Sequence, residues 1–447
     1  MRIQLLKYFF TSLVAFGIGV MILNSATLSR VNYRHCIDDS SIKFNESGVI
    51  DTNSQWRKLG LATYIFTAYL DDREPCSPLI TVMGFGEKSE SPLYGTLLLL
   101  SGAKIYLGKY GDRKKLNPTG HYTLGKLGPY AYLWLLPVEV IDARYSRSII
   151  VQQYHPTTGK TEAEIPITRP VYSTKTFGVC IDSPLFGPVK AQTIIQNIEI
   201  NKVLGAEWFT IYVYTSDQAS LQVLHKYAGE GLVDVVQNWG RGLPGDNTHY
   251  FGQTLSINEC AYRNMYRVKY LVYTDLDEFI VPRKSIGWAD MMKKIENFKY
   301  DTYLFRHSYF FENYNNTTLD SLHVSASQTE FTCNASYRVE LPKFLTSVIR
   351  LRKVHPPKEK SKYILRPLYK STIGVHEIFE HVGDHIKTYV VPPDYGLLHH
   401  YRLFSGGPNP VAASTVDDVK RNQRIPDEHA FVYKEKIVEA LRRRLCR

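Results

Sequence analysis

Two aspartates that follow an apolar stretch are the residues whose spacing most directly suggests chemistry. The segment 270–274 reads Tyr-Leu-Val-Tyr-Thr, and Asp275 and Asp277 come directly after it. Residues two apart in an extended chain point to the same side, so both carboxylates can converge on one cation while Leu276 faces away. A hard divalent ion held by carboxylates can bridge to the oxygens of a diphosphate. A solvated acidic turn is the plain alternative for an isolated Asp-x-Asp pair.

A second chemistry also uses Asp-x-Asp after an apolar strand. Haloacid-dehalogenase phosphatases use the first aspartate as a nucleophile, carry Thr or Val two residues after the second, and place the motif on the first strand of the domain. This chain has Phe279 at that position, and the motif follows at least three earlier predicted strands. We therefore rank a phosphatase below a site where a metal neutralises a leaving diphosphate.

The elements around the aspartates alternate between strand and helix. Short apolar runs predict strands at 177–181, 208–214, 232–236 and 270–274, and helices are predicted at 189–204, 217–227 and 251–268. This order is typical of an α/β domain with a parallel sheet and helices on both faces, in which ligands bind at the carboxyl ends of the strands. No glycine fingerprint follows the first strand, which argues against a dinucleotide enzyme and a P-loop ATPase.

The N-terminal residues predict how the chain is organised relative to a membrane. Arg2 and Lys7 precede an apolar run at 8–23, which favours an uncleaved signal anchor over a cleaved signal peptide. We divide the chain into a cytosolic tail at 1–7, a transmembrane helix at 8–28, a luminal stem at 29–55, a β-rich module at 56–170 and an α/β catalytic domain at 171–447. The net charge of +11 suits an anionic substrate better than nucleic acid, because no nucleic-acid-binding motif is present.

Two further features agree with a luminal location. Acceptor triplets for N-glycosylation occur at Asn45, Asn315, Asn316 and Asn334. The six cysteines include no Cys-x-x-Cys pair, which argues against zinc and allows disulfides in an oxidising compartment. Their pairing stays open, and Cys180 and Cys260, which lie in apolar segments, could instead be buried thiols.

Several segments together resemble glycosyltransferase family 92. The strongest is the stretch from Gly252 to Pro282, which includes Tyr-Thr-Asp-Leu-Asp-Glu-Phe-Ile-Val-Pro at its end. Further segments that look like the family are Trp239, His249–Gln253, Cys180–Gly187, His399–Arg402 and Tyr69–Arg73. The resemblance covers roughly 62–404, with one conservative departure at Glu259, where the family pattern has Asp.

The resemblance implies a GT-A-type fold, a Mn²⁺-dependent inverting transfer and a UDP-sugar donor. Galactose from UDP-galactose is the leading candidate for the sugar. The implied acceptor is a glycoprotein N-glycan, with its core fucose as the candidate position. The implied location is the Golgi membrane, with a single type II span and a luminal catalytic domain.

Named residues can be given roles within that hypothesis. Asp275 and Asp277 are the metal residues, Asp277 also acts in catalysis, and His400 is the third metal ligand, with His399 as its competitor. The predicted donor-binding residues are Gln253, Asn258 and Arg263, since arginine suits bidentate phosphate contact. An inverting transfer needs a general base, for which Glu377 and Glu312 are the candidates. The competing hypotheses are an inactive luminal glycan-binding protein and the phosphatase described above.

Overall fold

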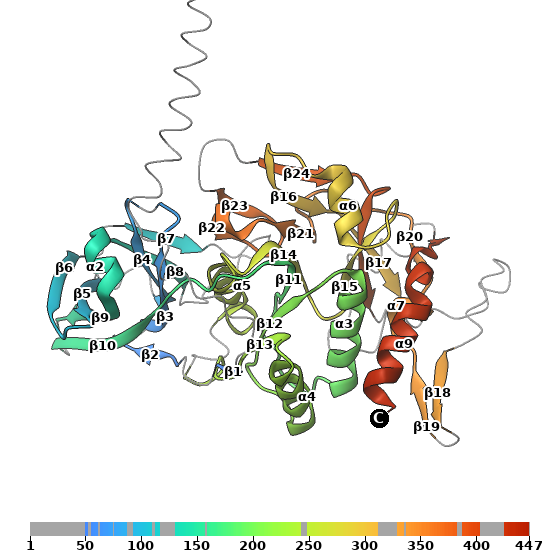
Figure 1. Ribbon diagram of the computed structural model, residues 1–447, viewed down its shortest axis with the longest axis horizontal. Coiled ribbons are helices and arrows are strands. Elements are labelled where there is room, and N and C mark those ends of the chain that lie inside the picture. Colours follow the sequence, from blue (N-terminus) through green and yellow to red (C-terminus); the bar gives the residue numbers. More distant parts are fainter. Residues whose placement is uncertain are drawn as a thin grey trace, which may run out of the picture.

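The computed structural model describes thirteen segments of the chain (Figure 1). These are residues 50–51, 55–60, 63–74, 76–86, 93–109, 112–116, 130–156, 159–242, 248–311, 329–334, 337–381, 387–402 and 424–446. Within these segments no helix is long and apolar enough to cross a membrane. The anchor predicted at 8–28 lies outside the described residues, as do Asn45, Asn315 and Asn316, and these remain predictions.

An eight-stranded mixed sheet forms the centre of the molecule. Four of its strands are parallel neighbours, namely β13 (Val233–Val236), β12 (Trp208–Tyr212), β11 (Lys175–Ile181) and β14 (Val268–Thr274). Beyond β14 the sheet continues through β21 (Lys362–Leu365), β16 (Tyr300–Phe305) and β24 (Lys387–Val391), and β21 is antiparallel to both its neighbours. At the opposite edge of the sheet, β1 (Ile50–Asp51) pairs with β13. The α/β class predicted from the sequence is therefore confirmed, but the sheet is mixed where a parallel one was expected.

Helices cover both faces of this sheet. Successive side chains of β11 point to opposite faces, so they belong to two different cores. Val179 and Ile181 pack in one core with residues of α3 (Ala191–Leu204), α4 (Gln218–Gly229), α6 (Trp288–Ile295) and α9 (Lys434–Leu445). Cys180 faces the other core, which is filled by α5 (Gln253–Arg263). Figure 1 shows α5 between the sheet and the blue strands of the N-terminal part.

Helix α5 is shorter than the helix predicted at 251–268. Tyr250, Phe251 and Gly252 all have positive φ, and only glycine adopts that conformation without strain, so the helix cannot begin before Gln253. At the other end the turn at Asn264 leads directly into β14. Helix α4 begins as predicted, because the Asp217 side chain accepts a hydrogen bond from the Ser220 backbone N–H.

The described residues between 56 and 170 form strands in two layers that share one core. One layer contains β2 (Arg57–Lys58), β3 (Tyr64–Asp71), β4 (Leu79–Gly86), β8 (Tyr130–Pro137) and β7 (Asp112–Leu116), and the other contains β6 (Lys104–Lys109), β5 (Leu93–Leu99), β9 (Ser146–His155) and β10 (Gly159–Thr168). A short helix, α2 (Val140–Tyr145), precedes β9. Strand β10 links the layers, since it pairs with β9 over most of its length and with β3 at Ile167 and Thr168.

The β-rich module packs against α5 through aromatic rings and one buried charge. Trp56 lies edge-on to Trp239 and donates a hydrogen bond from Nε1 to its carbonyl at 2.6 Å. Glu259, on α5 and fully buried, accepts hydrogen bonds from Tyr69 of β3 at 2.5 Å and from Tyr212 of β12, and it pairs with Arg263 at 2.7 Å. These contacts connect the β-rich module to α5 and to the central sheet. The boundary at 170–171 remains a prediction.

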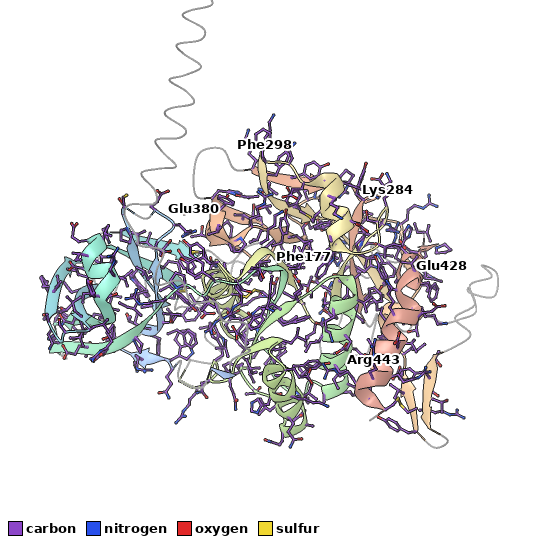
Figure 2. All side chains as sticks on the ribbon, viewed as in Figure 1. Phe177, Lys284, Phe298, Glu380, Glu428 and Arg443 are labelled. Carbon is purple, nitrogen blue, oxygen red and sulfur yellow. A yellow bond between two sulfur atoms is a disulfide. The ribbon has the colours of Figure 1, made fainter. Side chains whose placement is uncertain are left out.

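A second sheet lies beside the first and carries the chain that follows the Asp-x-Asp motif. Its strands are β15 (Glu278–Pro282), β25 (Gly396–Arg402), β17 (His307–Phe311), β20 (Ile349–Leu351) and β26 (Arg424–Pro426). Smaller elements are the hairpins β18 (Glu330–Asn334) with β19 (Tyr337–Glu340) and β22 (Lys370–Ile373) with β23 (Ile378–His381), the short helix α7 (Lys343–Thr346), and the 3-10 helices η3 (His249–Gly252), η5 (Pro367–Tyr369) and η6 (His429–Tyr433). Figure 2 shows Phe177 of β11 in the interior of the assembled molecule, whereas Phe298, Glu380 and Glu428 lie at its periphery.

Disulfides connect distant parts of the chain. Cys180 of β11 bonds to Cys260 of α5, and Cys333 of β18 bonds to Cys446 at the end of α9. Cys76 is also disulfide-bonded. The interpretation of Cys180 and Cys260 as buried thiols is therefore wrong, because the alternation of β11 turns Cys180 toward the helix that carries Cys260. Asn334 lies on β18, and its glycosylation remains a prediction.

The buried Glu259 generates a stability prediction. Changing Glu259→Gln removes the negative charge from the pocket that holds Arg263, and an uncompensated buried charge is strongly destabilising. We expect the free energy of unfolding, measured by urea titration, to fall by about 3 kcal/mol. The control Glu439→Gln removes an acid from the exposed i,i+4 pair with Arg443 and should change that free energy by less than about 0.5 kcal/mol. Equal losses in the two variants would contradict the structural role of Glu259.

Candidate metal and phosphate site

Charged side chains gather where the carboxyl ends of β11 and β14 meet. Asp182 follows β11, Asp275 follows β14, and the hydrogen-bonded pairing of these neighbouring strands brings the two acids to the same edge of the sheet. Lys362 reaches the same edge because β21 runs antiparallel to β14, so that its first residue lies beside the last residues of β14. The site is thus assembled by strand direction.

Asp275 is held from both sides. Its Oδ1 atom accepts a hydrogen bond from the Ser183 hydroxyl at 2.8 Å, and its Oδ2 atom lies 3.0 Å from the Lys362 ammonium. Ser183 in turn accepts a hydrogen bond from the Gln253 amide at 2.8 Å. Burial by itself would raise the pKa of the Asp275 carboxyl, but Lys362 and Ser183 outweigh burial and lower that pKa to about 2. Asp275 is therefore an ionised, fixed carboxylate.

Asp277 is the more open of the two predicted acids. Its side chain is 47% exposed, and its Oδ2 atom lies 3.2 Å from Nε2 of His400. His400 comes to this place because β15 pairs with β25 in a register that sets Glu278 opposite His400. The pair of Asp277 and His400 thus joins an exposed carboxylate to a nitrogen of a largely buried imidazole.

The structure also separates His400 from its competitor. Neighbouring residues of a strand face opposite sides of the sheet, and His399 accordingly stacks on Phe310 and forms a hydrogen bond with the Tyr401 hydroxyl at 3.0 Å. His400 instead meets Asp277 and Glu278. Of the two histidines, His400 is thus the one placed beside the predicted acids.

A second set of possible ligands lies behind His400. Glu278, His307 and His400 are all buried, and one ligand atom of each lies within 4.8 Å of the others. The Nδ1 atom of His400 is 3.2 Å from the Glu278 carboxylate and 3.0 Å from Nε2 of His307. A cation enclosed by these three would be closed to a diphosphate, whereas a cation between Nε2 of His400 and Asp277 would lie beside an exposed carboxylate.

The side chains of Asp277 and His400 are suitable ligands for a divalent metal. Carboxylate and imidazole together suit manganese, and a histidine that ligates a metal usually donates its other ring N–H to a carboxylate. Glu278 lies where it can accept that proton from Nδ1 of His400. This arrangement leaves Nε2 of His400 free to act as a ligand beside Asp277.

The three predicted donor-binding residues separate into two groups. Gln253 joins the site through Ser183. Asn258 is buried and bonds to both the N–H and the C=O of Ile373 at 2.9 and 2.7 Å, so it fastens β22 to α5. Arg263 pairs with Glu259 in the interior between α5 and the β-rich module. The geometry thus gives Asn258 and Arg263 structural contacts.

The two candidate bases also differ. Glu312 lies outside the described residues. Glu377 forms an ion pair with Lys358 at 2.7 Å, and it directly follows His376, whose ring bonds to the Ser361 carbonyl at 3.1 Å. Because Ser361 precedes Lys362, the His376 ring lies near the acidic cluster, and Glu377 is held by Lys358.

Several residues of the cluster were absent from the sequence-based set. Asp182 could have been found, because it follows the first strand of the domain as Asp275 follows its own strand. Glu278 adjoins the motif, but its direction depends on β25. His307 and Lys362 left no local signal, since Lys362 belongs to a lysine-rich stretch that resembles a solvated loop and only the antiparallel direction of β21 buries it.

Comparisons with known proteins give one family match and distant relatives. The model of glycosyltransferase family 92 matches residues 175–441. A β-1,4-galactosyltransferase of Caenorhabditis elegans, galt-1, is 28% identical over 130 residues, which are 28% of this chain and 30% of that protein. The family 92 protein C33H5.2 of the same organism is 26% identical over 142 residues, 30% of this chain and 27% of that protein. The aligned segments span less than a third of either relative.

A comparison with solved structures adds little. A β-glucuronidase of Ruminococcus gnavus is 16% identical, with 45% of this chain and 34% of that chain covered, at a TM-score of 0.16. A TM-score of this size carries no argument about fold or activity.

His376 generates a pH prediction. Burial, aided by Lys362, lowers the pKa of His376 to about 4, so the folded protein favours the neutral ring while the unfolded chain titrates near 6.5. The stability contributed by the neutral ring is present above pH 6.5 and is lost as the pH falls toward 4. In His376→Gln, urea titrations at pH 7.5 and pH 4.5 should show an acid-induced loss smaller by roughly 2 kcal/mol than in the wild type. An unchanged acid-induced loss would exclude this role.

Proposed function

The chain belongs to glycosyltransferase family 92, whose model covers more than half of it, and we propose that it transfers a hexose from a UDP-sugar to a glycan. Galactose from UDP-galactose is the proposed donor sugar, since galt-1, a relative, is named a β-1,4-galactosyltransferase. A glycoprotein N-glycan, with its core fucose as the site of attachment, is the proposed acceptor. We further propose a type II protein of the Golgi membrane, anchored by residues 8–28.

One observation carries the proposal, namely the open pair of Asp277 and His400 beside the fixed carboxylate of Asp275. Four parallel strands end at this edge, and antiparallel β21 follows them in the sheet, which supports the GT-A type of fold. In such a site Asp277 and Nε2 of His400 would hold Mn²⁺, with Asp275 close by. The bound metal supplies positive charge that neutralises the leaving diphosphate.

The chain's own residues would do the rest of the work. Gln253 and Ser183 keep Asp275 in place, which preorganises the charge of the site before the donor arrives. Glu377 is the proposed base, which takes the proton of the acceptor hydroxyl as that oxygen bonds to the anomeric carbon. The bond between the anomeric carbon and the diphosphate oxygen breaks with inversion, and UDP leaves. The ion pair with Lys358 orients Glu377 at the rim.

The competing hypotheses explain less of the geometry. A phosphatase nucleophile must reach its phosphate directly, but both oxygens of Asp275 are engaged by Ser183 and Lys362. The motif also follows the fourth strand of the α/β domain, after β11, β12 and β13. An inactive glycan-binding protein does not require an exposed carboxylate beside an imidazole. A UDP-release assay with and without Mn²⁺ distinguishes all three hypotheses.

Replacing the open metal ligands should abolish donor turnover. With the full chain in detergent, UDP release from UDP-galactose should require Mn²⁺ and stop with EDTA. Asp277→Asn and His400→Ala should each lower the rate by about 10² or more, because the diphosphate would leave without charge neutralisation. The control Asp394→Asn alters an exposed acid paired with Lys284 and should keep the wild-type rate.

Three outcomes would contradict the proposal in different ways. Turnover of Asp277→Asn at the full rate would remove the assigned metal site. Phosphate release without any sugar nucleotide would favour the phosphatase. No turnover with any UDP-sugar, tested with fucosylated and unfucosylated glycan acceptors, would favour the binding protein.

A further inference from the structure

Lys362 is buried in the middle of three carboxylates. Its side chain is 0% exposed, and its Nζ atom lies 2.5 Å from Oδ2 of Asp182, 3.0 Å from Oδ2 of Asp275 and 3.6 Å from Oε2 of Glu278. Asp182 and Glu278 are also almost completely buried. No step in the proposed transfer requires a lysine at this position, so its presence needs a separate explanation.

The charges of this group do not balance without a cation. Three carboxylates in a site with little water repel one another strongly, and a buried charge is tolerated only when it is paired. The Lys362 ammonium lies within 3.6 Å of one oxygen of each acid, so it is the cation with which all three are paired. Lys362 therefore supplies the positive charge at the centre of this group.

The strand directions explain why Lys362 lies among these three acids. β21 pairs with β14 so that Tyr363 lies opposite Tyr273, and Lys362, one residue earlier, lies at the level where β14 ends. On its other side, Lys362 lies opposite Phe305 of β16. Its ammonium consequently lies at the point on which the carboxylate oxygens of two parallel strand ends and of β15 converge. A cluster of oxygens around one point is also the environment that a divalent cation requires.

We propose that Lys362 is a permanent internal cation, which occupies the place that a second divalent ion would otherwise take and so confines the exchangeable metal to Asp277 and His400. The exchangeable metal rests on the proposed function, whereas the role of Lys362 rests on its own contacts. Lys362 is a positioning residue: it fixes one oxygen of Asp275 and pairs with Asp182 and Glu278. The site then holds one metal ion without the mutual repulsion of its acids.

Replacing the lysine tests this proposal through metal stoichiometry. In Lys362→Met the three carboxylates lose their cation, and we expect them to take up Mn²⁺, so that equilibrium dialysis of the full chain finds two ions per chain where the wild type binds one. Without metal, the variant should unfold at a lower temperature than the wild type, and Mn²⁺ should raise its midpoint more than it raises that of the wild type. A merely structural lysine would lower the midpoint without changing the stoichiometry.

Two control variants make the measurement specific. Lys362→Arg keeps a cation in place and should bind one ion, and Lys436→Met, which removes an exposed lysine from α9, should behave as the wild type. Should Lys362→Met not fold, the double variant Lys362→Met with Asp182→Asn has one uncompensated carboxylate fewer and carries the same measurement. A folded variant without Lys362 that gains no ion and no additional stabilisation by Mn²⁺ would overturn the proposal.

A second double variant separates this proposal from the proposed function. Lys362→Met with Asp277→Asn should lose the exchangeable ion but keep the ion that replaces the lysine. If the wild type binds no Mn²⁺ while Lys362→Met does, the metal-dependent function fails and the role of Lys362 stands. If neither protein binds Mn²⁺, both fail.

Discussion

The interaction on which the site depends is the neutralisation of acids that the sheet forces together. Parallel strands end at one edge, so Asp182 and Asp275 meet there whatever their mutual repulsion, and the turn into β15 adds Glu278. Coulomb repulsion between buried carboxylates grows as water is excluded. Lys362 on one side and His400 on the other oppose it. The central sheet can therefore end in acids only because β21 and β25 bring cationic or hydrogen-bonding groups to the same edge.

The second sheet has a corresponding role for the open end of the cluster. The chain leaves the central sheet at Asp275 and enters the second sheet at Glu278, so the two motif aspartates lie at the junction. Asp275 is held by groups of the central sheet, whereas Asp277 meets His400 of the second. The two acids of one short motif thereby acquire different environments, one fixed and one open. That difference allows one carboxylate to organise the site while the other remains free for a ligand.

Helix α5 connects this edge to the β-rich module. Its first residue, Gln253, bonds to Ser183, and its later residue Glu259 accepts hydrogen bonds from the module and the sheet. The disulfide between Cys180 and Cys260 fixes the same helix to β11. The module thus supports the face of the sheet opposite α3 and α4.

The sequence by itself determined the local features of this protein. Apolar runs and their alternation predicted the first four strands of the catalytic domain, and the Asp-x-Asp motif with its flanking segments indicated family 92. These features are local because side-chain period and motif spacing are properties of consecutive residues. What the tertiary structure decided was which distant groups meet them. The register between β15 and β25 places His400 rather than His399 beside the acids. Asn258, a predicted donor-binding residue, forms hydrogen bonds with Ile373 of β22. Lys362 is the clearest case, because an exposed loop lysine and a buried counter-cation look the same in sequence, and only the direction of β21 distinguishes them.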